Sequence, residues 1–562
     1  MPPRCQAAMR RSDAPQEASD MPNMTDYEAT RATFSLDVPA RFNAATDVVD
    51  ARAASQPDKL ALRMVSPDGR QAEDYSFADL RVRSNRVAHV LADHGVVKGD
   101  RVFLMLPRVI GWYDTVLGAI KLGAIPMPGT TQLKGKDVAY RINQAGATVA
   151  VTDPDGVATI EAVGEECPTL QTRIVMGGPV KGWVDGDAAR DAASTAAPPA
   201  DITASDDAML IYFTSGTTGN PKMVLHTQAS YGIGHQITAR FWQDLGPDDV
   251  FWGVSDTGWA KAAWSKLFGQ WSLGAAVLAW NAQGKPDFDQ MLRMIADHDV
   301  TVFCAPPTIY RNFVTRDLSG YDFGRLRHCL AAGEALNAET FSRWKAATGT
   351  EIHDGYGQTE TVNLLANYPC LAIKPGSLGK PTPGFDVAVV DADGTALPPG
   401  NEGQIAVRVT PQRPVGLFAE YWRDEEATRA AHLGEWYLTG DRAHVDRDGY
   451  FWFVSRDDDV IISSGYRIGP FEVESAIMEH PSVQEVACIG VPDEERGEVV
   501  KAFVILAAGH EPSEALAEEI KAHVRSVTAP YKYPRQIEFL AELPKTVSGK
   551  VRRVDLRARG AG

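Results

Sequence analysis

The chain has 562 residues, too many for one hydrophobic core, so we expect at least two domains. Hydrophobic residues make up 44% of the sequence and charged residues 23%, which is typical of a globular enzyme. The formal net charge of -17 excludes a general nucleic-acid binder, because neutralising a phosphate backbone needs a basic face. A small basic pocket for nucleotide phosphates is still compatible with this charge.

The cysteines and the apolar stretches indicate the compartment. The six cysteines lie far apart, which predicts reduced thiols in a cytoplasmic protein rather than a zinc site or a disulfide framework. The longest apolar stretch, 267–280, is too short to cross a bilayer, so no stable membrane insertion is expected. Residues 1–30 are expected to form a disordered tail. A transit peptide containing Arg4, Arg10 and Arg11 is the alternative, although acidic residues soon interrupt its basic character.

The first part of the sequence alternates helical and strand patterns. Apolar residues recur at helical spacing over 75–95, and the apolar run 101–106 is typical of a buried strand. A second helix-like segment at 113–122 is followed by a strand-like segment at 148–152. This alternation predicts parallel sheets covered by helices. The segment 185–201 is rich in Ala, Asp and Pro and predicts a loose surface connection.

A dense group of glycine and hydroxyl residues follows the strand-like run 208–213. The group consists of Thr214, Ser215, Gly216, Thr217, Thr218, Gly219, Asn220, Pro221 and Lys222. Glycines let backbone N–H groups approach phosphate oxygens, the hydroxyls add donors, and the lysine adds a positive charge. The spacing is not that of a Walker A loop, so another phosphate chemistry is indicated. A flexible turn without a ligand is the alternative.

Two later segments suit the rest of a nucleotide. In the segment 354–360, Glu360 can hold Mg²⁺, Thr359 can donate to an α-phosphate, and Tyr356 can stack on adenine. A polar helix start is the alternative for this segment. Farther along, Asp441 follows a glycine and can accept hydrogen bonds from both ribose hydroxyls, although a single aspartate in a turn is more often structural.

The pattern changes again in the last third of the sequence. Strand-like runs separated by glycine turns lie at 387–390, 404–408 and 450–454, which predicts hairpins. A mainly β subdomain is therefore expected over about 381–455. After residue 456 the pattern becomes mixed helix and strand, which predicts a domain boundary there.

Together and in this order, these motifs resemble the signatures of the adenylate-forming superfamily of acyl-CoA synthetases, peptide-synthetase adenylation domains and luciferases. The resemblance covers about residues 54–553, and the segments 112–113, 128–132 and 255–264 look like the medium-chain acyl-CoA synthetase branch. It implies an α/β fold whose large N-terminal domain has two parallel-type α/β sheets plus a β subdomain, with a small mobile α+β C-terminal domain. The implied bounds are 31–455 for the N-terminal adenylation domain, 456–459 for a hinge and 460–562 for a C-terminal lid.

The resemblance also implies the site residues. Those for ATP or AMP are Thr214, Ser215, Gly216, Thr217, Thr218, Gly219, Lys222, Gly333, Glu334, Ala335, Asp354, Gly355, Tyr356, Thr359, Asp441, Arg456 and Lys550. Those for CoA are Ser464, Gly465, Arg467, Arg496 and Tyr533. The implied catalytic residues are Lys550, Thr214 and Glu360, Glu360 is also the metal residue, and Asp458 is the hinge residue.

The implied reaction has two halves. A carboxylate attacks the α-phosphorus of ATP and expels pyrophosphate, with Lys550 bridging the two anions. The C-terminal domain then rotates about Asp458, and the thiol of CoA displaces AMP. ATP, Mg²⁺, CoA and a small carboxylic acid are therefore the expected ligands, and a homodimer is compatible with the family.

The acid is indicated by two residues. Acetate and propionate enzymes of this family carry a tryptophan at the position of Gly357, so glycine predicts a deeper pocket for a medium-chain fatty, branched or aryl acid. Trp259 is the candidate wall residue, although buried tryptophans more often serve packing. Three alternatives stay open at this point: an adenylation enzyme that loads a carrier-protein thiol, a luciferase-like oxygenase, and a non-catalytic nucleotide-binding homologue.

Overall fold

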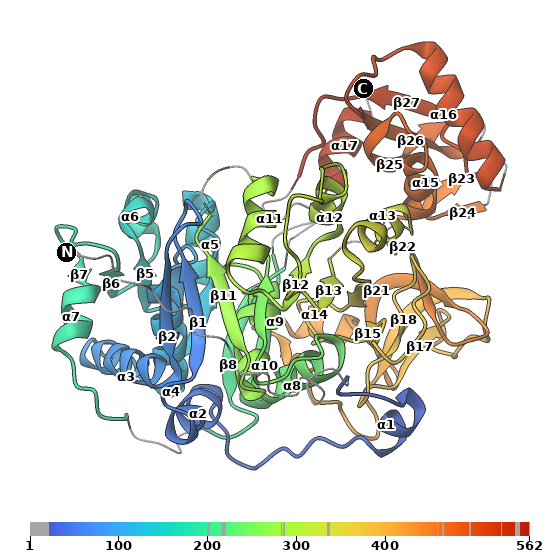
Figure 1. Ribbon diagram of the computed structural model, residues 1–562. Helices are drawn as coiled ribbons and strands as arrows, with labels where there is room; N and C mark the ends of the chain where they lie inside the picture. The colour runs from blue at the N-terminus through green and yellow to red at the C-terminus, as the bar shows by residue number, and fades with distance from the viewer. Residues whose placement is uncertain are drawn as a thin grey trace, which may run out of the picture.

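The structure, a computed structural model, shows a large body followed by a small C-terminal domain (Figure 1). It describes residues 22–198, 203–214, 221–282, 284, 287–333, 336, 338–457, 459–463, 466–493, 496–529, 531–545 and 551–560, without the side chain of Arg467. Among these residues, no helix is both long and apolar enough to span a membrane. The large body and the C-terminal domain have separate hydrophobic cores.

The first unit of the large body is built on a five-stranded parallel sheet with the strand order β4-β3-β5-β6-β7. Its strands are β3 (Arg101–Met105), β4 (Ile125–Pro128), β5 (Val149–Thr152), β6 (Thr172–Val175) and β7 (Val184–Asp185). Its helices are α3 (Phe77–Asp93), α4 (Ile110–Lys121), α5 (Gly135–Ala145), α6 (Pro154–Glu161) and α7 (Gly186–Ala192). Strands β4 and β5 are buried along their whole length, as a parallel sheet covered by helices requires. The alternation predicted for this part is confirmed.

The predicted loose connection over 185–201 is wrong for its first part, because helix α7 lies there. Asp185 begins this helix by accepting a hydrogen bond from the N–H of Ala188 at 3.0 Å. On the helix, Arg190 lies 3.8 Å from the buried carboxylate of Asp114. The cap is a local signal that the composition of the segment masks, whereas the contact of Arg190 with a buried charge is a tertiary effect that no local pattern reveals.

The second unit is built on a nine-stranded sheet with the order β16-β15-β14-β13-β12-β10-β11-β1-β2. Its strands are β1 (Leu60–Val65), β2 (Ala72–Ser76), β10 (Val250–Gly253), β11 (Ala276–Trp280), β12 (Val302–Ala305), β13 (His328–Ala331), β14 (Ile352–Tyr356), β15 (Leu365–Ala366) and β16 (Lys380–Pro381). Its helices are α9 (Lys261–Lys266), α10 (Phe268–Ser272), α11 (Phe288–Asp297), α12 (Pro307–Phe313) and α13 (Ala338–Thr348). The central strands from β14 to β1 are parallel, so their carboxyl ends share one edge of the sheet.

Two antiparallel sheets complete the large body. The three-stranded one contains β8 (Ala208–Phe213), β9 (Met223–Thr227) and β19 (Glu420–Tyr421). The five-stranded one contains β17 (Val387–Val390), β18 (Glu402–Arg408), β20 (His432–Leu433), β21 (Trp436–Val445) and β22 (Phe451–Arg456). Strand β17 pairs with β18, and β21 pairs with β22, so the predicted hairpins are confirmed.

The N-terminal segment is ordered earlier than predicted. The expected disordered tail reaches residue 30, but helix α1 (Tyr27–Thr33) begins before that point. Asp26 caps the helix, Tyr27 stacks on Tyr368 with ring centroids 5.8 Å apart, and Met24 is buried. These contacts hold the chain from residue 22 onward, whereas residues 1–21 lie outside the described part.

The other short helices are η2 (Ala44–Asp50), α2 (Ala51–Ser55), η3 (Gly164–Glu166), η4 (Gln228–Ile233), α8 (His235–Ile237), η5 (Thr238–Trp242) and α14 (Glu425–Ala430).

The C-terminal domain is an α+β unit at the end of the chain, drawn in orange and red in Figure 1. Its sheet has the order β24-β23-β26-β25, with β27 paired to β26. The strands are β23 (Ile461–Ser463), β24 (Tyr466–Ile468), β25 (Val483–Asp493), β26 (Gly497–Leu506) and β27 (Gln536–Phe539), and the helices are α15 (Pro470–Met478), α16 (Glu514–Val527) and α17 (Arg553–Gly560). With two parallel-type sheets, a β subdomain and this unit, the predicted fold class is confirmed.

Candidate active site

The predicted phosphate loop connects strands β8 and β9. Two hydrogen bonds connect its first residue, Thr214, with its last residue, Lys222. The N–H of Thr214 donates to the carbonyl of Lys222 at 3.0 Å, and the N–H of Lys222 donates to the Thr214 hydroxyl at 3.0 Å. The base of the loop is therefore closed by the antiparallel pairing of the two strands. The remaining glycine and hydroxyl positions of the loop, residues 215–220, lie outside the described part.

The sheet brings two other predicted segments to one edge. Strands β10, β12, β13 and β14 are neighbours and parallel, so the residues that follow them meet at their carboxyl ends. Those residues include Gly333 after β13 and the motif 354–360 at the end of β14. In open α/β sheets this edge is the usual place for a ligand. Distant stretches of sequence thus converge because strand direction, not sequence distance, decides where they lie.

Asp441 and Arg456 lie opposite each other on neighbouring strands of the β subdomain. The guanidinium of Arg456 is 3.7 Å from one carboxylate oxygen of Asp441. The other oxygen accepts hydrogen bonds from the hydroxyl of Tyr356 and from the side-chain amide of Gln358, each at 2.6 Å. The structure therefore brings together the predicted ribose, adenine and phosphate residues. Gln358 belongs with them, although the sequence reasoning did not select it.

Glu360 is a buried carboxylate near Lys222, the last residue of the predicted phosphate loop. Its side chain accepts a hydrogen bond from the hydroxyl of Tyr421 at 2.8 Å, and the ammonium of Lys222 lies 4.6 Å from the centre of the Tyr421 ring. Burial raises the pKa of Glu360, while Tyr421 and Lys222 oppose that rise. Mg²⁺ that binds nucleotide phosphates commonly uses one or two carboxylates, and Glu360 is a carboxylate of this kind. A cation here would offset the free-energy cost of burying the negative charge of Glu360, so the residue fits the predicted metal role.

Asp354 and Gly355 occupy the buried end of strand β14. Asp354 accepts a hydrogen bond from the N–H of Gly355 at 3.0 Å, and burial raises the pKa of its carboxyl to about 8. A side chain at Gly355 would meet the indole of Trp242 at 2.4 Å. Glycine at position 355 therefore lets the strand pass close to Trp242. Gly333 has a φ of +107°, a backbone conformation that favours glycine.

Gly357 does not open an empty space, because the indole of Trp264 fills it. A Cβ atom at position 357 would lie 2.3 Å from the Trp264 ring and 2.6 Å from the carbonyl oxygen of Val362. Trp264 lies on helix α9, is buried, and packs edge-on against Trp242. Glycine at position 357 therefore does not by itself deepen a pocket, because Trp264 occupies the space beside it. Trp259, which precedes α9, is half-buried, and its indole N–H has no hydrogen-bond partner among the described residues.

Of the predicted CoA residues, Arg496 and Tyr533 are described with their side chains. Arg496 directly precedes Gly497, whose backbone pairs with Ser463 of β23. Tyr533 is stacked between two guanidinium groups, those of Arg525 at 3.9 Å and Arg535 at 4.8 Å. The backbone of Arg467 belongs to β24, and its side chain is not described. A basic and aromatic surface of this kind suits a phosphorylated nucleotide.

Several predicted residues lie outside the described part of the chain. They are Ser215, Gly216, Thr217, Thr218, Gly219, Glu334, Ala335, Asp458, Ser464, Gly465 and Lys550. Lys545 and Val551, on either side of Lys550 in the sequence, form a β-bridge with each other. The carboxylate of Glu485 holds Lys545 at 2.7 Å. The roles given to these residues stay predictions.

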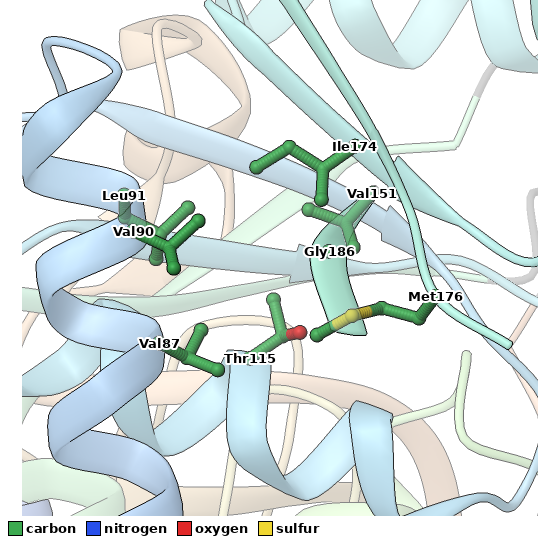
Figure 2. Close-up of a pocket in the computed structure, with 8 residues that line it drawn as sticks. All are labelled: Val87, Val90, Leu91, Thr115, Val151, Ile174, Met176 and Gly186. Carbon is green, nitrogen blue, oxygen red and sulfur yellow. The ribbon is translucent and has the colours of Figure 1, made fainter. Parts of the chain in front are cut away.

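Two hollows in the structure lie away from these side chains. A cavity of about 10 Å³ in the first unit is lined mainly by apolar side chains of α3, α4 and the sheet, shown in Figure 2. At that size, with apolar walls, it is a packing gap rather than a ligand site. A cleft of about 840 Å³ separates α13 and the β subdomain from α15 of the C-terminal domain. It contains Trp452, Phe471 and Glu472, and no predicted site residue lines it.

The sequence reasoning missed the residues that hold this site in shape. They are His226, Tyr231, Trp264, Gln358, Tyr421 and Tyr437. Gln358 and Tyr437 lie inside or beside recognised motifs, and the hydroxyl of Tyr437 donates to the amide oxygen of Gln358 at 3.0 Å. That position in a motif is a signal that can be read from sequence. Trp264 ends the recognised segment 255–264, whereas no local pattern marks His226, Tyr231 or Tyr421.

Comparison with known proteins agrees with this geometry. The AMP-binding enzyme family matches residues 49–422, and the AMP-binding enzyme C-terminal domain matches residues 472–550. The mitochondrial acyl-coenzyme A synthetase ACSM3 of Mus musculus is 44% identical over 549 residues, covering 96% of this chain and 94% of that protein. The chain therefore belongs to the AMP-binding enzyme family. Within that family it is an acyl-CoA synthetase, as the sequence predicts.

Solved structures give the same class. The anthranilate CoA ligase AuaEII, solved in complex with anthranoyl-AMP, matches with a TM-score of 0.86 and 32% identity, covering 93% of this chain and 98% of that one. A benzoate CoA ligase from Burkholderia xenovorans LB400 matches with a TM-score of 0.80 and 29% identity, covering 92% and 100% of the two chains. ATP and CoA are therefore the substrates that accompany the acid, and the expected AMP-forming ligation of an acid to CoA is confirmed.

The predicted cytoplasmic location is wrong by the same comparison. The similar synthetases ACSM3 and ACSM5 are named as mitochondrial proteins. The prediction gave weight to the acidic residues that interrupt the basic N-terminal segment and to the reduced cysteines. A reduced thiol does not distinguish these compartments, so the cysteine argument could not identify the location.

Proposed function

We propose that this acyl-CoA synthetase activates a medium-chain fatty, branched or aryl acid, in two half-reactions at one site. The acid first reacts with ATP to give an acyl-adenylate and pyrophosphate, and CoA then takes the acyl group and releases AMP. One observation carries the proposal: a single segment, 356–360, contributes both to the hydrogen-bonded cluster around Asp441 and the buried carboxylate Glu360. A ribose acceptor and a metal residue are thereby held close together.

Charge neutralisation governs the first half-reaction, because a carboxylate must approach a triphosphate. Lys222 and Lys550 supply positive charge, and the hydroxyl of Thr214 adds a donor at the start of the phosphate loop. Glu360 holds Mg²⁺, which when bound stabilises the charge that develops on the phosphates. Tyr356 and Thr359 orient the adenine and the α-phosphate, and Asp441 with Arg456 orients the ribose.

The second half-reaction requires the C-terminal domain to change position. We place its hinge at 456–459 with Asp458 as the pivot, between an N-terminal domain over 31–455 and a C-terminal lid over 460–562. Rotation removes Lys550 from the site and brings the side chains of Arg467, Arg496 and Tyr533 to CoA, with Ser464 and Gly465 along its path. The separate core of this domain supports such a movement, because the domain can turn as a unit. A homodimer stays a prediction, which light scattering of the purified protein tests.

Buried aromatic side chains beside Gly357 supply apolar surroundings that favour a bulky acyl group of apolar or aromatic character. Trp264, Trp242 and His235 form a contiguous aromatic cluster there, with ring centroids 5.9–6.2 Å from Trp264. Aromatic faces pack well against aliphatic chains and aryl rings. The anthranilate and benzoate CoA ligases among the similar structures are named for aryl acids, which supports the aryl part of the proposal.

The test is AMP release in the presence of ATP, Mg²⁺ and CoA across a panel of straight-chain, branched and aryl acids. We expect the highest kcat/KM with medium-chain or aryl acids and little turnover of acetate. A preference for acetate would overturn the assignment of the acid. Transfer to a carrier-protein thiol with none to CoA would favour the alternative of a carrier-loading enzyme. Omitting Mg²⁺ in the presence of a chelator is expected to stop pyrophosphate release.

A further inference from the structure

The carbonyl oxygen of Thr359 accepts two hydrogen bonds from the segment that follows the phosphate loop. The imidazole Nε2 of His226 lies 2.8 Å from this oxygen, and the hydroxyl of Tyr231 lies 2.7 Å from it. His226 belongs to β9, which begins directly after Lys222, and Tyr231 lies in the next helical turn, η4. Thr359 immediately precedes Glu360. The two donors therefore connect the strand behind the phosphate loop to the residue next to the metal carboxylate.

His226 and Tyr231 act as one rigid pair. Their rings stack with centroids 3.3 Å apart and an angle of 17°, and both side chains are fully buried. A carbonyl oxygen only accepts hydrogen bonds, so Nε2 of His226 carries the proton. Nδ1 then accepts from the hydroxyl of Ser230 at 3.1 Å. The hydrogen-bond network thus fixes the tautomer of His226 and the direction of its N–H bond.

Glu360 is held to the same strand from its other side. Its carboxylate accepts from Tyr421, whose strand β19 pairs with β9 through Tyr421 and Val224. The backbone carbonyl of Glu360 accepts from the N–H of Phe418 at 2.7 Å. Strand β9 therefore contacts the Thr359–Glu360 segment through the His226–Tyr231 pair and again through β19. The position of Glu360 relative to the phosphate loop depends on these two connections.

We propose that His226 and Tyr231 are positioning residues that fix Thr359 and Glu360 relative to the phosphate loop, so that Mg²⁺ and the triphosphate are held in one productive geometry. Neither residue needs to touch a substrate for this role. The inference rests on the proposed function, in which Glu360 holds the metal. Misplacement of a catalytic group by about 1 Å can lower a rate by about 10²-fold, so a pair that sets this distance has a large influence on the first half-reaction.

A pair that serves packing alone would change stability and leave metal dependence untouched. The Tyr231→Phe variant separates the two roles, because it keeps the ring and its stacking and removes one hydrogen bond to Thr359. The Tyr27→Phe variant is the matched control. Its hydroxyl is also buried and donates to a backbone carbonyl, that of Pro381, at 2.8 Å, and Tyr27 belongs to α1. Both variants lose one buried hydrogen bond to a carbonyl.

The experiment measures acid-dependent pyrophosphate release against Mg²⁺ and ATP concentration, together with thermal unfolding. We expect Tyr231→Phe to lower kcat by about five- to tenfold, the effect of one hydrogen bond, and to raise the Mg²⁺ concentration for half-maximal rate. Tyr27→Phe and Tyr231→Phe should shift Tm by similar amounts. Tyr27→Phe should leave kcat and the Mg²⁺ concentration for half-maximal rate at the wild-type values. His226→Phe should reduce kcat at least as strongly, and His226→Gln, which keeps an N–H donor, should recover part of the loss.

Each result has a defined meaning. If wild-type protein releases no pyrophosphate with any acid, the proposed function fails. If wild-type protein is active and Tyr231→Phe matches Tyr27→Phe in kcat and Mg²⁺ dependence, the positioning role is overturned while the function stands. Failure of Tyr231→Phe to fold, when Tyr27→Phe folds, would also overturn the positioning role, because it would assign the hydroxyl to stability.

Discussion

The proposed nucleotide site of the large body consists of buried side chains, whereas the surface of the C-terminal domain exposes large apolar ones. In the large body, Asp441 and Glu360 are buried, and tyrosine hydroxyls donate to their carboxylates at 2.6 and 2.8 Å. In the C-terminal domain, Tyr466 and Tyr531 stack on each other with centroids 4.3 Å apart, yet they are 52% and 38% exposed. Most of the exposed large apolar side chains in the described residues belong to this small domain.

The difference distinguishes a preorganised site from a surface that is available to contact a ligand or another surface. A buried carboxylate with a bonded partner is in position before the substrate arrives, which reduces the reorganisation needed for reaction. An exposed aromatic pair is available to pack against a ligand or another surface. The large body is therefore expected to be sensitive to small changes in shape, and the C-terminal domain to changes that restrict its movement or remove its contacts. Four experiments separate these expectations.

The largest effect is expected from the Lys550→Ala variant. Loss of a charge contact made mainly in the transition state typically lowers a rate by about 10²–10³-fold, so acyl-adenylate formation should nearly stop. Thioester formation from supplied acyl-adenylate and CoA should continue. The Asp458→Pro variant, which restricts a backbone dihedral at the hinge, should show the reverse pattern. Rapid-quench assays of the two half-reactions make the comparison. Equal loss of both in either variant would remove the division of labour between the two domains.

The second effect tests how tightly the large body is packed around Gly357. A Gly357→Ala change places a methyl group 2.6 Å from the carbonyl oxygen of Val362, a backbone atom that cannot rotate away. We expect a loss of about 1–3 kcal/mol of stability from overpacking, with a lower kcat/KM for every acid. Gly320→Ala is the control, because no atom of the described residues other than its own chain neighbours lies within 4 Å of its Cβ position. Denaturant unfolding measures the stability, and equal midpoints for the two variants would contradict the packing described here.

The third effect concerns the pH dependence that burial creates at Asp354. The unfolded carboxyl ionises near its ordinary pKa of 3.8, whereas burial holds the folded pKa at about 8. Between these values the folded state binds the extra proton, so stability falls as pH rises through this window and levels off above it. The Asp354→Asn variant should show a flatter stability profile from pH 4 to pH 8.

The control for this measurement is Asp248→Asn, whose carboxyl is 94% exposed. This variant should follow the wild-type profile. Thermal unfolding at several pH values measures all three proteins. A slope in Asp354→Asn identical to that of the wild type would show that Asp354 ionises as an ordinary carboxyl in the folded state.

The smallest effect is expected at the surface of the C-terminal domain. Tyr466→Ala removes one member of an exposed stack, so stability should change by less than about 0.5 kcal/mol. If this surface meets CoA, KM for CoA should rise by about two- to tenfold, the worth of one aromatic contact, with adenylation unchanged. Val97→Ala, an exposed apolar position of the large body, should leave both unchanged. An unchanged KM for CoA in Tyr466→Ala would place CoA elsewhere.

Local patterns in the sequence predict the elements but not the contacts between them. The strands at 208–213 and 387–390, and the site residues Glu360 and Asp441, can be read from hydrophobic runs, turns and motifs. His226 could not be found in this way, because its partner Thr359 is 133 residues away and no local pattern marks the contact. The same holds for Trp264 and Gly357. Glycine at a pocket position predicts space only when no neighbouring element fills it, and that depends on packing.

The packing of Trp264 against Gly357 constrains how this enzyme could change its acid. A larger residue at position 357 meets the indole first, so that substitution is harmful as long as Trp264 is present. Removing the indole first leaves a cavity that the larger residue can then occupy. The two positions are therefore epistatic, and in the proposed acyl pocket a substitution of Trp264 in helix α9 must precede a larger residue at position 357. Libraries that randomise position 357 alone will miss the variants that a paired library contains.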